Sequence, residues 1–564
     1  MNESKSAAGH ARRLILLGLD GATFTNLKPW AEDGTLPHLA RIMKQGAWGQ
    51  LASTVPPTTP PAWTSVVTGK NPGKHGIFDF RESPYRARWR PLITSASAHG
   101  RKIWTILNER DLQCGVLNVP ITWPPEPIES FMISGMMTPG PESSWAHPPE
   151  LKREVDELTG GYYPDLDIAK YDTGQDADAL EFLRDVQTHF ERRRRAMFHL
   201  MQTRPWQFFM AVFILPDRIQ HLFWKYMDPS FELYHCPQAK RLRPRILEAY
   251  RRMDSMLGQV LERLDERTDL IILSDHGFGG TETWFNVNVW LERQGLLFRA
   301  RKGAFRHWLF YQAMLIDEWK LTRSLVPGPI QSAIRRRIRA RRNSIQSNVM
   351  DQIDWAKTKA FFSGIPSQGI YLNLKGEDGL GVVEPGEEAE ALRRRIRESL
   401  LELKDPDTGK PLMEEVRLRE ELYHGPQTPY APDILFKARN YGALGRSLFG
   451  DRRPLRDSRG APNGFHRPEG ALLAIGPNFR QGGFGLEGAR MIDIAPTALH
   501  ALGLPVPDDM DGQVLHTMFS ESFMRGHPVQ TCEAPADQAR AQMGYTEEET
   551  EKLKQRLKAL GYME

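Results

Sequence analysis

Three apolar runs limit the folds that are open to this chain. Each is as long as a β-strand, and its central residues are apolar on both faces of that strand. The runs lie at Leu14–Leu19, Phe208–Leu215 and Asp269–Ser274. A strand without a polar face is buried on both sides, which is typical of a parallel sheet covered by helices. The sequence therefore predicts an α/β fold.

Each apolar run leads to an aspartate. Asp20 directly follows the first run, Asp275 directly follows the third, and Asp217 comes two residues after the second. The carboxyl ends of the strands form the ligand-binding edge of open α/β sheets, so the three carboxylates are candidate site residues. For Asp20 an ordinary turn aspartate is the alternative, because aspartate is common before a glycine such as Gly21.

Composition and charge narrow the class of protein. The 564 residues are 40% hydrophobic and 26% charged, and none of the apolar runs is long enough to span a bilayer. The start, Met1–Arg13, is polar and basic, and the first apolar run is too short for a secretory signal. Three cysteines without a CxxC pair suit a reducing compartment, so we expect a cytoplasmic protein. A net charge of +4 gives no reason to expect a nucleic-acid partner.

A short helix with a hydroxyl at its start is predicted between Thr59 and Gly69. Thr59 fits the N-cap, Pro60 the first helical position, and Gly69 the position that ends the helix. The start of a helix favours an anion such as phosphate. Pro60 and Pro61 remove two N–H donors at the start of this helix, so a metal would have to neutralise more of the negative charge of a bound phosphate. The alternative is an ordinary capping threonine.

Histidines accompany the same segments. If Pro216 starts a helix, Asp217 and His221 are separated by four residues and lie on one face, from which both can reach a single metal ion. His276 follows the third apolar run. His466 is expected in a loop beside the strand 471–475.

The alternation of strands and helices breaks between residues 299 and 342 and resumes from about residue 360. Residues 299–342 interleave aromatic residues with arginines, which is typical either of a helical lid or of a segment that contacts an anionic membrane surface. Residues 360–430 indicate a small α+β subdomain, after which the sheet is expected to resume at Ala431–Phe436. We therefore expect an α/β domain at 12–298 and 431–519, an insertion at 299–430, and a linker with a charged C-terminal helix at 520–564.

In this order the motifs resemble those of the alkaline phosphatase superfamily, and most of all its type I phosphodiesterase / nucleotide pyrophosphatase branch. The motifs are Asp20, Thr59, His75-Gly76-Ile77, Pro216-Asp217 with His221, Ser274-Asp275-His276-Gly277, and His466. They extend over nearly the whole chain, from about residue 12 to 516. The resemblance implies an alkaline-phosphatase-like three-layer sandwich with a mostly parallel central sheet and an inserted cap.

The resemblance also implies two divalent metal ions, usually zinc, in one site. The first ion would be held by Asp217, His221 and His466. The second would be held by Asp20, Asp275, His276 and the Thr59 hydroxyl. Carboxylate and imidazole ligands suit zinc. A metal on the Thr59 oxygen would make it nucleophilic near neutral pH, so a covalent phosphothreonine would form and water would then release it.

One position departs from the family pattern. Nucleotide pyrophosphatases carry, after the His-Gly-Ile motif, an asparagine that donates to a phosphoryl oxygen, and Phe80 takes that place here. A phenyl ring cannot donate a hydrogen bond. Either another group such as Arg81 supplies the contact, or the substrate is not of the nucleotide type. Sulfatases of the superfamily need Cys-x-Pro-x-Arg or Ser-x-Pro-x-Arg, which the segment 59–63 does not match.

The sequence thus predicts a two-metal hydrolase of phosphoric esters, of the phosphodiesterase or phosphatase type. Two alternatives stay open at this point. A phosphoryl mutase or transferase of the same superfamily would pass the phosphoryl group to an acceptor other than water. A metal-stabilised, non-catalytic binding protein would be expected to have lost at least one of the seven candidate ligands, and all seven are present.

Overall fold

The computed structural model describes residues 12–87, 90–168, 170–171, 175–300, 349–376, 381–449, 453–457, 464–536 and 544–563. The chain forms two compact units, each described by itself. The first contains Met1–Gly279, Tyr423–Ala431 and His466–Leu560, and the second contains Gly280–Leu422, Pro432–Phe465 and Gly561–Glu564. Nearly all of the predicted lid or membrane-contacting segment, 299–342, lies outside the described residues. Among the helices that are described, none has both the length and the apolar character needed to cross a membrane.

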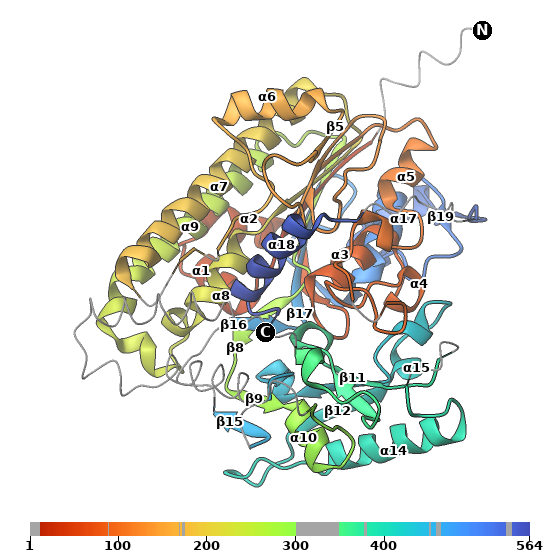
Figure 1. Cartoon of the computed structure of the whole chain (residues 1–564). Coiled ribbons are helices and arrows are strands. Elements are labelled where there is room, and N and C mark those ends of the chain that lie inside the picture. The colour runs from red at the N-terminus through yellow and green to blue at the C-terminus, as the bar shows by residue number, and fades with distance from the viewer. Residues whose placement is uncertain are drawn as a thin grey trace. The chain divides into compact units, whose positions relative to one another are not determined.

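A nine-stranded sheet runs through the first unit (Figure 1). Its order is β18 (Phe484–Arg490), β2 (Ala47–Ala52), β17 (Glu469–Ile475), β7 (Thr268–Leu273), β1 (Arg13–Leu19), β6 (Phe208–Phe213), β3 (Cys114–Val119), β4 (Phe131–Ser134) and β5 (Ala146–His147). The three apolar runs form β1, β6 and β7, and β1 pairs in parallel with both neighbours. β3 also pairs in parallel with β6 and β4, whereas β17 is antiparallel to β7 and β2. The predicted mostly parallel sheet is confirmed.

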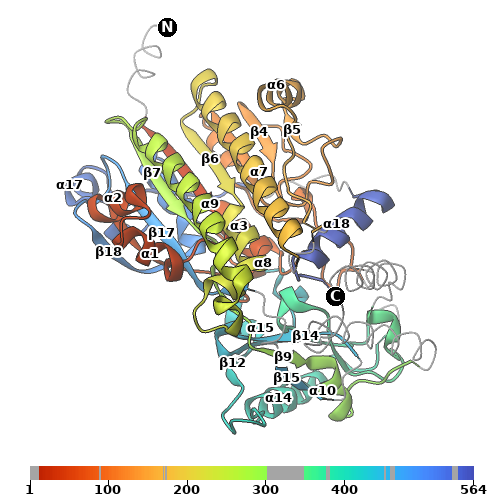
Figure 2. The ribbon, with the colours of Figure 1, turned by 90° about the vertical axis from the view of Figure 1, so that its left-hand side faces the viewer.

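Helices cover both faces of this sheet, so the first unit has three layers. On one face lie α1 (Phe24–Glu32), α2 (Pro37–Gln45), α7 (Asp176–Thr203), α8 (Leu215–Met227) and α9 (Pro237–Leu261), and Figure 2 shows α7 and α9 side by side in front of the strands. On the other face lie α3 (Thr59–Thr68), α5 (Ile103–Asn108) and α16 (Ile494–Ala501). Side chains alternate along β1, and Leu14 and Leu16 share a core with Trp63 of α3 and Trp104 of α5.

The strand directions bring several chain segments to one edge of the sheet. Parallel strands β1, β6 and β7 end at the same edge, so the segments that follow them emerge together. Because β17 is antiparallel to β7, with Leu472 opposite Leu273, β17 begins at that same edge. The residues before β17 therefore reach the same place as the residues after β1, β6 and β7.

The second unit is built mostly on antiparallel strands. Its four-stranded sheet has the order β10 (Ala360–Phe362), β11 (Gly369–Leu372), β13 (Ile434–Ala438) and β12 (Met413–Leu418), and a smaller sheet joins β14 (Ala443–Arg446), β9 (Thr283–Asn286) and β15 (Leu455–Asp457). In these two sheets β14 pairs with β9 in parallel, and the other described pairings are antiparallel. Its described helices include α10 (Val287–Arg293), α14 (Glu387–Leu401) and α15 (Arg419–Leu422). The chain enters this unit along β8 (Gly277–Gly280) and leaves it along β16 (Gly464–Arg467).

Two expectations about the later part of the chain need correction. The strand expected at Ala431–Phe436 exists as β13, but it pairs with β11 and β12, so the central sheet resumes only at β17. An apolar run identifies a strand, whereas its partners depend on distant residues. The stretch after residue 520 contains α17 (Glu521–Gly526) and β20 (Thr531–Cys532) ahead of the expected charged helix, α18 (Glu547–Ala559).

The His75-Gly76-Ile77 motif joins two helices of the first unit. His75 ends α4 (Pro72–His75) and is fully buried. Its Nδ1 accepts the N–H of Ile77 at 3.1 Å, so its proton is on Nε2, which donates to Ser65 Oγ of α3 at 3.0 Å. The neutral ring thus holds α4 against α3. Burial lowers the pKa of His75 to about 3.

This arrangement predicts acid sensitivity that His75→Gln should reduce. Below about pH 6.5 the unfolded histidine gains a proton that the folded one, with its pKa near 3, does not accept. The free energy of unfolding should therefore fall as the pH is lowered, by up to about 1.4 kcal/mol per pH unit. Denaturant titrations of both proteins between pH 5 and 8 measure the difference, in which shared contributions such as that of Asp269 cancel. A difference that is constant with pH would contradict a folded state in which His75 stays neutral.

Candidate active site

Three aspartates meet at the carboxyl edge of the sheet. Asp20 directly follows β1, Asp275 follows β7, and Asp217 stands in the first turn of α8, which follows β6. α8 has Pro216 in its first turn, so the predicted helix start is confirmed. The Asp217 N–H donates to the Asp20 carbonyl oxygen at 3.0 Å, which ties α8 to the end of β1. All three side chains are buried.

Each of these carboxylates has one oxygen held by the protein and one without a hydrogen-bond partner. Trp63 Nε1 donates to Asp20 Oδ2 at 3.1 Å, the Gly21 N–H donates to Asp275 Oδ1 at 3.2 Å, and Arg218 donates to Asp217 Oδ2. Within the described part of the chain, no hydrogen bond reaches Asp20 Oδ1, Asp217 Oδ1 or Asp275 Oδ2. Buried oxygens of this kind are costly unless a cation or a donor satisfies them.

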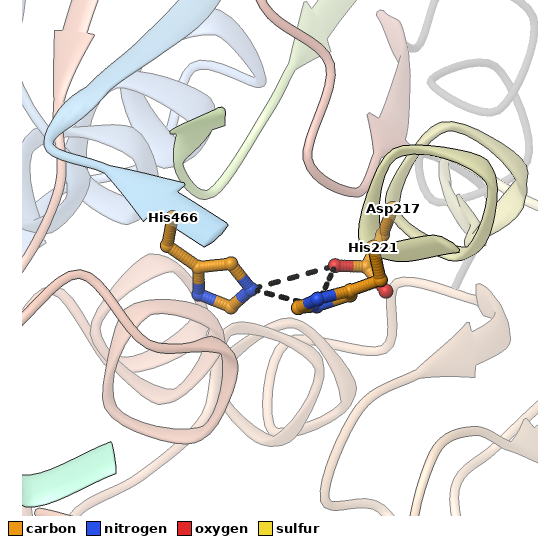
Figure 3. Close-up of side chains that lie close together, drawn as sticks. All are labelled: Asp217, His221 and His466. Atoms are coloured by element: carbon orange, nitrogen blue, oxygen red, sulfur yellow. Dashed lines mark hydrogen bonds and ion pairs between the residues drawn. The ribbon is translucent and has the colours of Figure 1, made fainter. Parts of the chain in front are cut away.

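Asp217, His221 and His466 surround one point (Figure 3). His221 Nε2 lies 3.2 Å from Asp217 Oδ1, and His466 Nε2 lies 3.2 Å from His221 Nε2 and 3.5 Å from Asp217 Oδ1. His466 Nδ1 donates to the Pro57 carbonyl oxygen at 2.8 Å, which leaves the Nε2 lone pair directed at the group. Asp217 and His221 come from α8 and His466 comes from β16, so the group joins distant parts of the chain.

A second group shares Asp217 with the first. Ligand atoms of Asp20, Asp217 and His276 all lie within 4.8 Å of one another. His276 Nε2 is 3.3 Å from Asp275 Oδ2 and 3.8 Å from Asp20 Oδ1, and its Nδ1 bonds to the Gly277 carbonyl oxygen at 3.1 Å. The rings of His276 and His466 stack with centroids 3.4 Å apart. Asp217 was expected to serve one metal only, but it belongs to both groups.

Thr59 completes the cluster of seven residues singled out in the sequence. Its Oγ1 lies 3.4 Å from His276 Nε2. The structure corrects its helical position by one residue: Thr58 is the extended N-cap, and Thr59 is the first residue of α3. The neighbouring threonine hydroxyls have different surroundings from that of Thr59. Thr64 Oγ1 donates to the Pro60 carbonyl oxygen at 2.7 Å. Thr58 Oγ1 is buried without a hydrogen-bond partner among the described residues.

Burial controls the protonation of the site. It raises the pKa of Asp20 and of Asp275 well above the ordinary value, and the neighbouring carboxylates raise both further. The pKa of Asp217 is well below the ordinary value because His221, His466 and Arg218 outweigh its burial. A divalent cation between the carboxylates would favour the ionised form of all three.

His276 and His466 are set up as neutral ligands. Burial lowers the pKa of His276 well below the ordinary value and that of His466 to about 4. A neutral imidazole whose Nδ1 is engaged offers its Nε2 lone pair to a metal. Together with the free carboxylate oxygens, these ring nitrogens form the mixed oxygen and nitrogen donor set that suits zinc. The residues present therefore fit divalent metal ions.

Sequence reasoning missed two features of the site. His466 was expected in a loop, but it lies in β16, whose short and partly polar sequence gives little strand signal. Trp63 was not singled out, although it stands one turn after Thr59 on α3 and holds Asp20. A Cβ at Gly18 of β1 would collide with the Trp63 ring, so this glycine makes room for the indole.

Trp63→Phe should weaken metal binding while keeping the ring in the core. The variant removes the indole N–H that donates to Asp20 Oδ2 and so directs Oδ1 toward a cation. Loss of a hydrogen-bond partner behind a metal ligand costs about 10- to 100-fold in metal affinity. The matched control is Trp104→Phe, which removes an equally buried indole N–H that donates to Glu126 Oε2 at 2.9 Å. Calorimetric zinc titration measures both variants. Equal affinities in Trp63→Phe, Trp104→Phe and the unmodified protein would rule out this role.

Comparison with known proteins agrees with the predicted resemblance. Residues 14–442 match the model of the type I phosphodiesterase / nucleotide pyrophosphatase family. Among solved structures, the chain is similar to human ectonucleotide pyrophosphatase / phosphodiesterase 5, with a TM-score of 0.46 and 15% identity over 92% of this chain and 99% of that one. It is also similar to an inactive threonine-to-alanine variant of the murine protein in complex with AMP, with a TM-score of 0.43 and 14% identity over 87% of this chain and 95% of that one.

No curated protein sequence matches the chain. The family match covers well over half of its residues and includes six of the seven candidate site residues, all except His466. The chain belongs to the type I phosphodiesterase / nucleotide pyrophosphatase family, a family of phosphoric-ester hydrolases.

Proposed function

We propose that the protein is a two-metal phosphoric-ester hydrolase that acts through a covalent phosphothreonine on Thr59. The observation that carries the proposal is the set of three buried carboxylates, each with one oxygen fixed by a protein donor and one left free. The free oxygens lie beside histidine Nε2 atoms, and the Thr59 hydroxyl lies 3.4 Å from one of these atoms, His276 Nε2. Two divalent ions, which we take to be zinc, would supply positive charge that favours the Thr59 alkoxide and neutralises the phosphoryl oxygens.

The chain's own residues supply position and the nucleophile. Asp217, His221 and His466 would hold one ion, and Asp20, Asp275, His276 and Thr59 would hold the other, to which Asp217 would also contribute because it belongs to both groups. Thr59 Oγ would form a bond to phosphorus while the ester bond to the leaving alcohol breaks. Water would then cleave the Thr59 phosphoester. In the net reaction the hydroxyl of water ends on phosphorus and its proton ends on the alcohol.

Three features favour Thr59 over its neighbours as the nucleophile. Thr59 Oγ1 is near His276 and, among the described residues, has no backbone acceptor of the kind that occupies Thr64 Oγ1. As the first residue of α3 it stands where the helix terminus favours an anion. Thr58 remains the competitor, because its hydroxyl is buried and lacks a hydrogen-bond partner among the described residues.

The substrate is proposed only as a phosphate ester. Phe80 is fully buried, and its N–H donates to Asp79 Oδ1 at 2.6 Å. Arg81, the expected replacement for the missing asparagine, directs its Nε to the Arg90 carbonyl oxygen at 2.8 Å. This contact supports a structural use of Arg81 in place of a phosphoryl contact. A hydrolysis panel that compares a phosphodiester with its matching monoester would identify the preferred ester class.

Metal stoichiometry should separate the two groups of ligands. Zinc-loaded protein should carry close to two ions per chain, and exhaustive chelation should abolish hydrolysis until zinc is returned. His221→Ala should remove mainly one ion, whereas Asp217→Ala should weaken both, because Asp217 belongs to both groups. The measurement is metal analysis after dialysis against a defined free-zinc buffer.

The control for this experiment is Asp254→Ala. Asp254 is also a buried aspartate, but it accepts the His38 and Leu39 N–H groups away from the site. It should keep two ions per chain. Full activity after chelation with no detectable metal, or two ions retained by Asp217→Ala, would overturn the proposed metal centre.

Thr59→Ala should lower turnover by several orders of magnitude, as removal of a covalent nucleophile does elsewhere. Thr59→Ser keeps a hydroxyl at the same backbone position and should retain part of the activity. Thr58→Ala, which removes the adjacent buried hydroxyl, is the matched control and should remain active. Rapid-quench trapping with a labelled ester and peptide mapping locates the phosphoryl group. Label on Thr58, or normal turnover in Thr59→Ala, would show the assignment to be wrong.

A further inference from the structure

The C-terminal helix α18 contacts the candidate metal centre through a buried chain of alternating charges. The chain consists of Arg556 on α18, Asp165 in the segment before α7, Arg218 on α8 and the site residue Asp217. All four belong to the first unit. The family model matches only as far as residue 442, so α18 lies outside the matched segment.

Arg556 is fixed by three acceptors. Its Nη1 lies 3.3 Å from Asp165 Oδ2 and donates to the Thr138 carbonyl oxygen at 3.0 Å. Its Nη2 donates to the Pro139 carbonyl oxygen at 3.2 Å. The side chain is only 10% exposed. Because the guanidinium is planar, three contacts of this kind hold both its position and its orientation against Asp165.

Asp165 divides its two oxygens between two arginines. Arg218 Nη2 donates to Oδ1 at 3.0 Å, and Arg556 takes Oδ2. Against the effect of burial, Arg218 and Arg556 keep the pKa of Asp165 below its ordinary value, so the carboxylate stays ionised. The other end of the Arg218 guanidinium, Nη1, donates to Asp217 Oδ2. Arg218 is therefore held between two carboxylates.

This shared guanidinium determines which oxygen Asp217 directs at the metal ligands. With Oδ2 occupied by Arg218, Oδ1 faces His221 and His466. A guanidinium between two carboxylates takes a position that depends on both. Without Arg556, Asp165 would be free to turn toward Arg218 and draw it away from Asp217.

We propose that Arg556 is a positioning residue for Asp217, and that the C-terminal helix thereby forms part of the active site. The inference rests on the proposed function, in which Asp217 is a metal ligand. It also makes a claim that is independent of metal: Arg556 stabilises the first turn of α8, where the Asp217 N–H bonds to the Asp20 carbonyl oxygen.

A second attachment of the same helix provides a matched control. Just before α18, the Tyr545 hydroxyl lies 3.1 Å from the Ile93 carbonyl oxygen and 3.0 Å from that of Met137. Its ring stacks on Trp123 with centroids 4.7 Å apart. Tyr545→Phe therefore weakens the attachment of α18 and leaves all four residues of the charged chain in place. Lys552→Met changes the exposed face of α18, where Lys552 pairs with Glu548.

The test compares Arg556→Lys with these two controls in the full-length protein. Lysine keeps the charge but cannot reproduce the planar set of contacts, so a change in cation affinity reports position and not net charge. Loss of a residue directly behind a ligand costs about 10- to 100-fold in metal affinity. Arg556 acts two residues further out, behind Asp165 and Arg218, so we expect zinc affinity at the first group to fall by about 10-fold at most. Tyr545→Phe and Lys552→Met should bind zinc as the unmodified protein does.

The second measurement uses metal-free protein. Amide hydrogen exchange in residues 215–221 should be faster in Arg556→Lys, and faster still in Arg556→Met, than in Tyr545→Phe. Unchanged exchange in both Arg556 variants would overturn the inference. An equal loss of zinc affinity in Tyr545→Phe would also overturn it, because docking of the helix in general would then explain the effect. If the unmodified protein neither binds zinc nor hydrolyses esters, the proposed function fails while the exchange measurement still decides the role of Arg556.

Discussion

Bringing three carboxylates into one buried place is costly, because each charge loses its hydration and the charges repel one another. The first unit offsets this cost with one fixed donor for each carboxylate: an indole N–H, a backbone N–H and a guanidinium. These donors do more than lower the cost. Each occupies one oxygen and so selects the other for the interior of the site, where the histidine nitrogens and the Thr59 hydroxyl are found.

The direction of the strands explains how such distant residues meet. Parallel strands β1, β6 and β7 deliver the three aspartates to one edge of the sheet. The aspartates come after their strands, whereas His466 comes before β17. It reaches the same edge because β17 runs antiparallel to β7. The reversed direction of β17 in a mostly parallel sheet therefore allows a residue late in the chain to join the carboxylates.

Much of this could be predicted from local patterns. Apolar runs identified β1, β6 and β7, and their ends pointed to Asp20 and Asp275; the spacing of Asp217 and His221 on a helix needed no distant information. The start of α3 was wrong by one residue, because both threonines before Pro60 suit a cap.

What could not be predicted depends on pairing between distant segments. β13 was a correct strand in the wrong sheet. The contact of Arg556 with Asp165 joins residues 391 positions apart, and nothing near either residue indicates the other. Buried ion pairs of this kind follow from the completed fold and leave no periodic signal in the sequence.

The stacked rings of His276 and His466 have a consequence for how proteins of this design diversify. The chain departs along β8 immediately after His276 and comes back along β16, which carries His466. The two ends of a long excursion are thus adjacent whatever lies between them, which is the condition under which inserted domains are tolerated. Evolution can lengthen, shorten or exchange that excursion without separating the two imidazoles. Proteins of this design can then acquire new substrates through a changed insertion while they keep the same site residues.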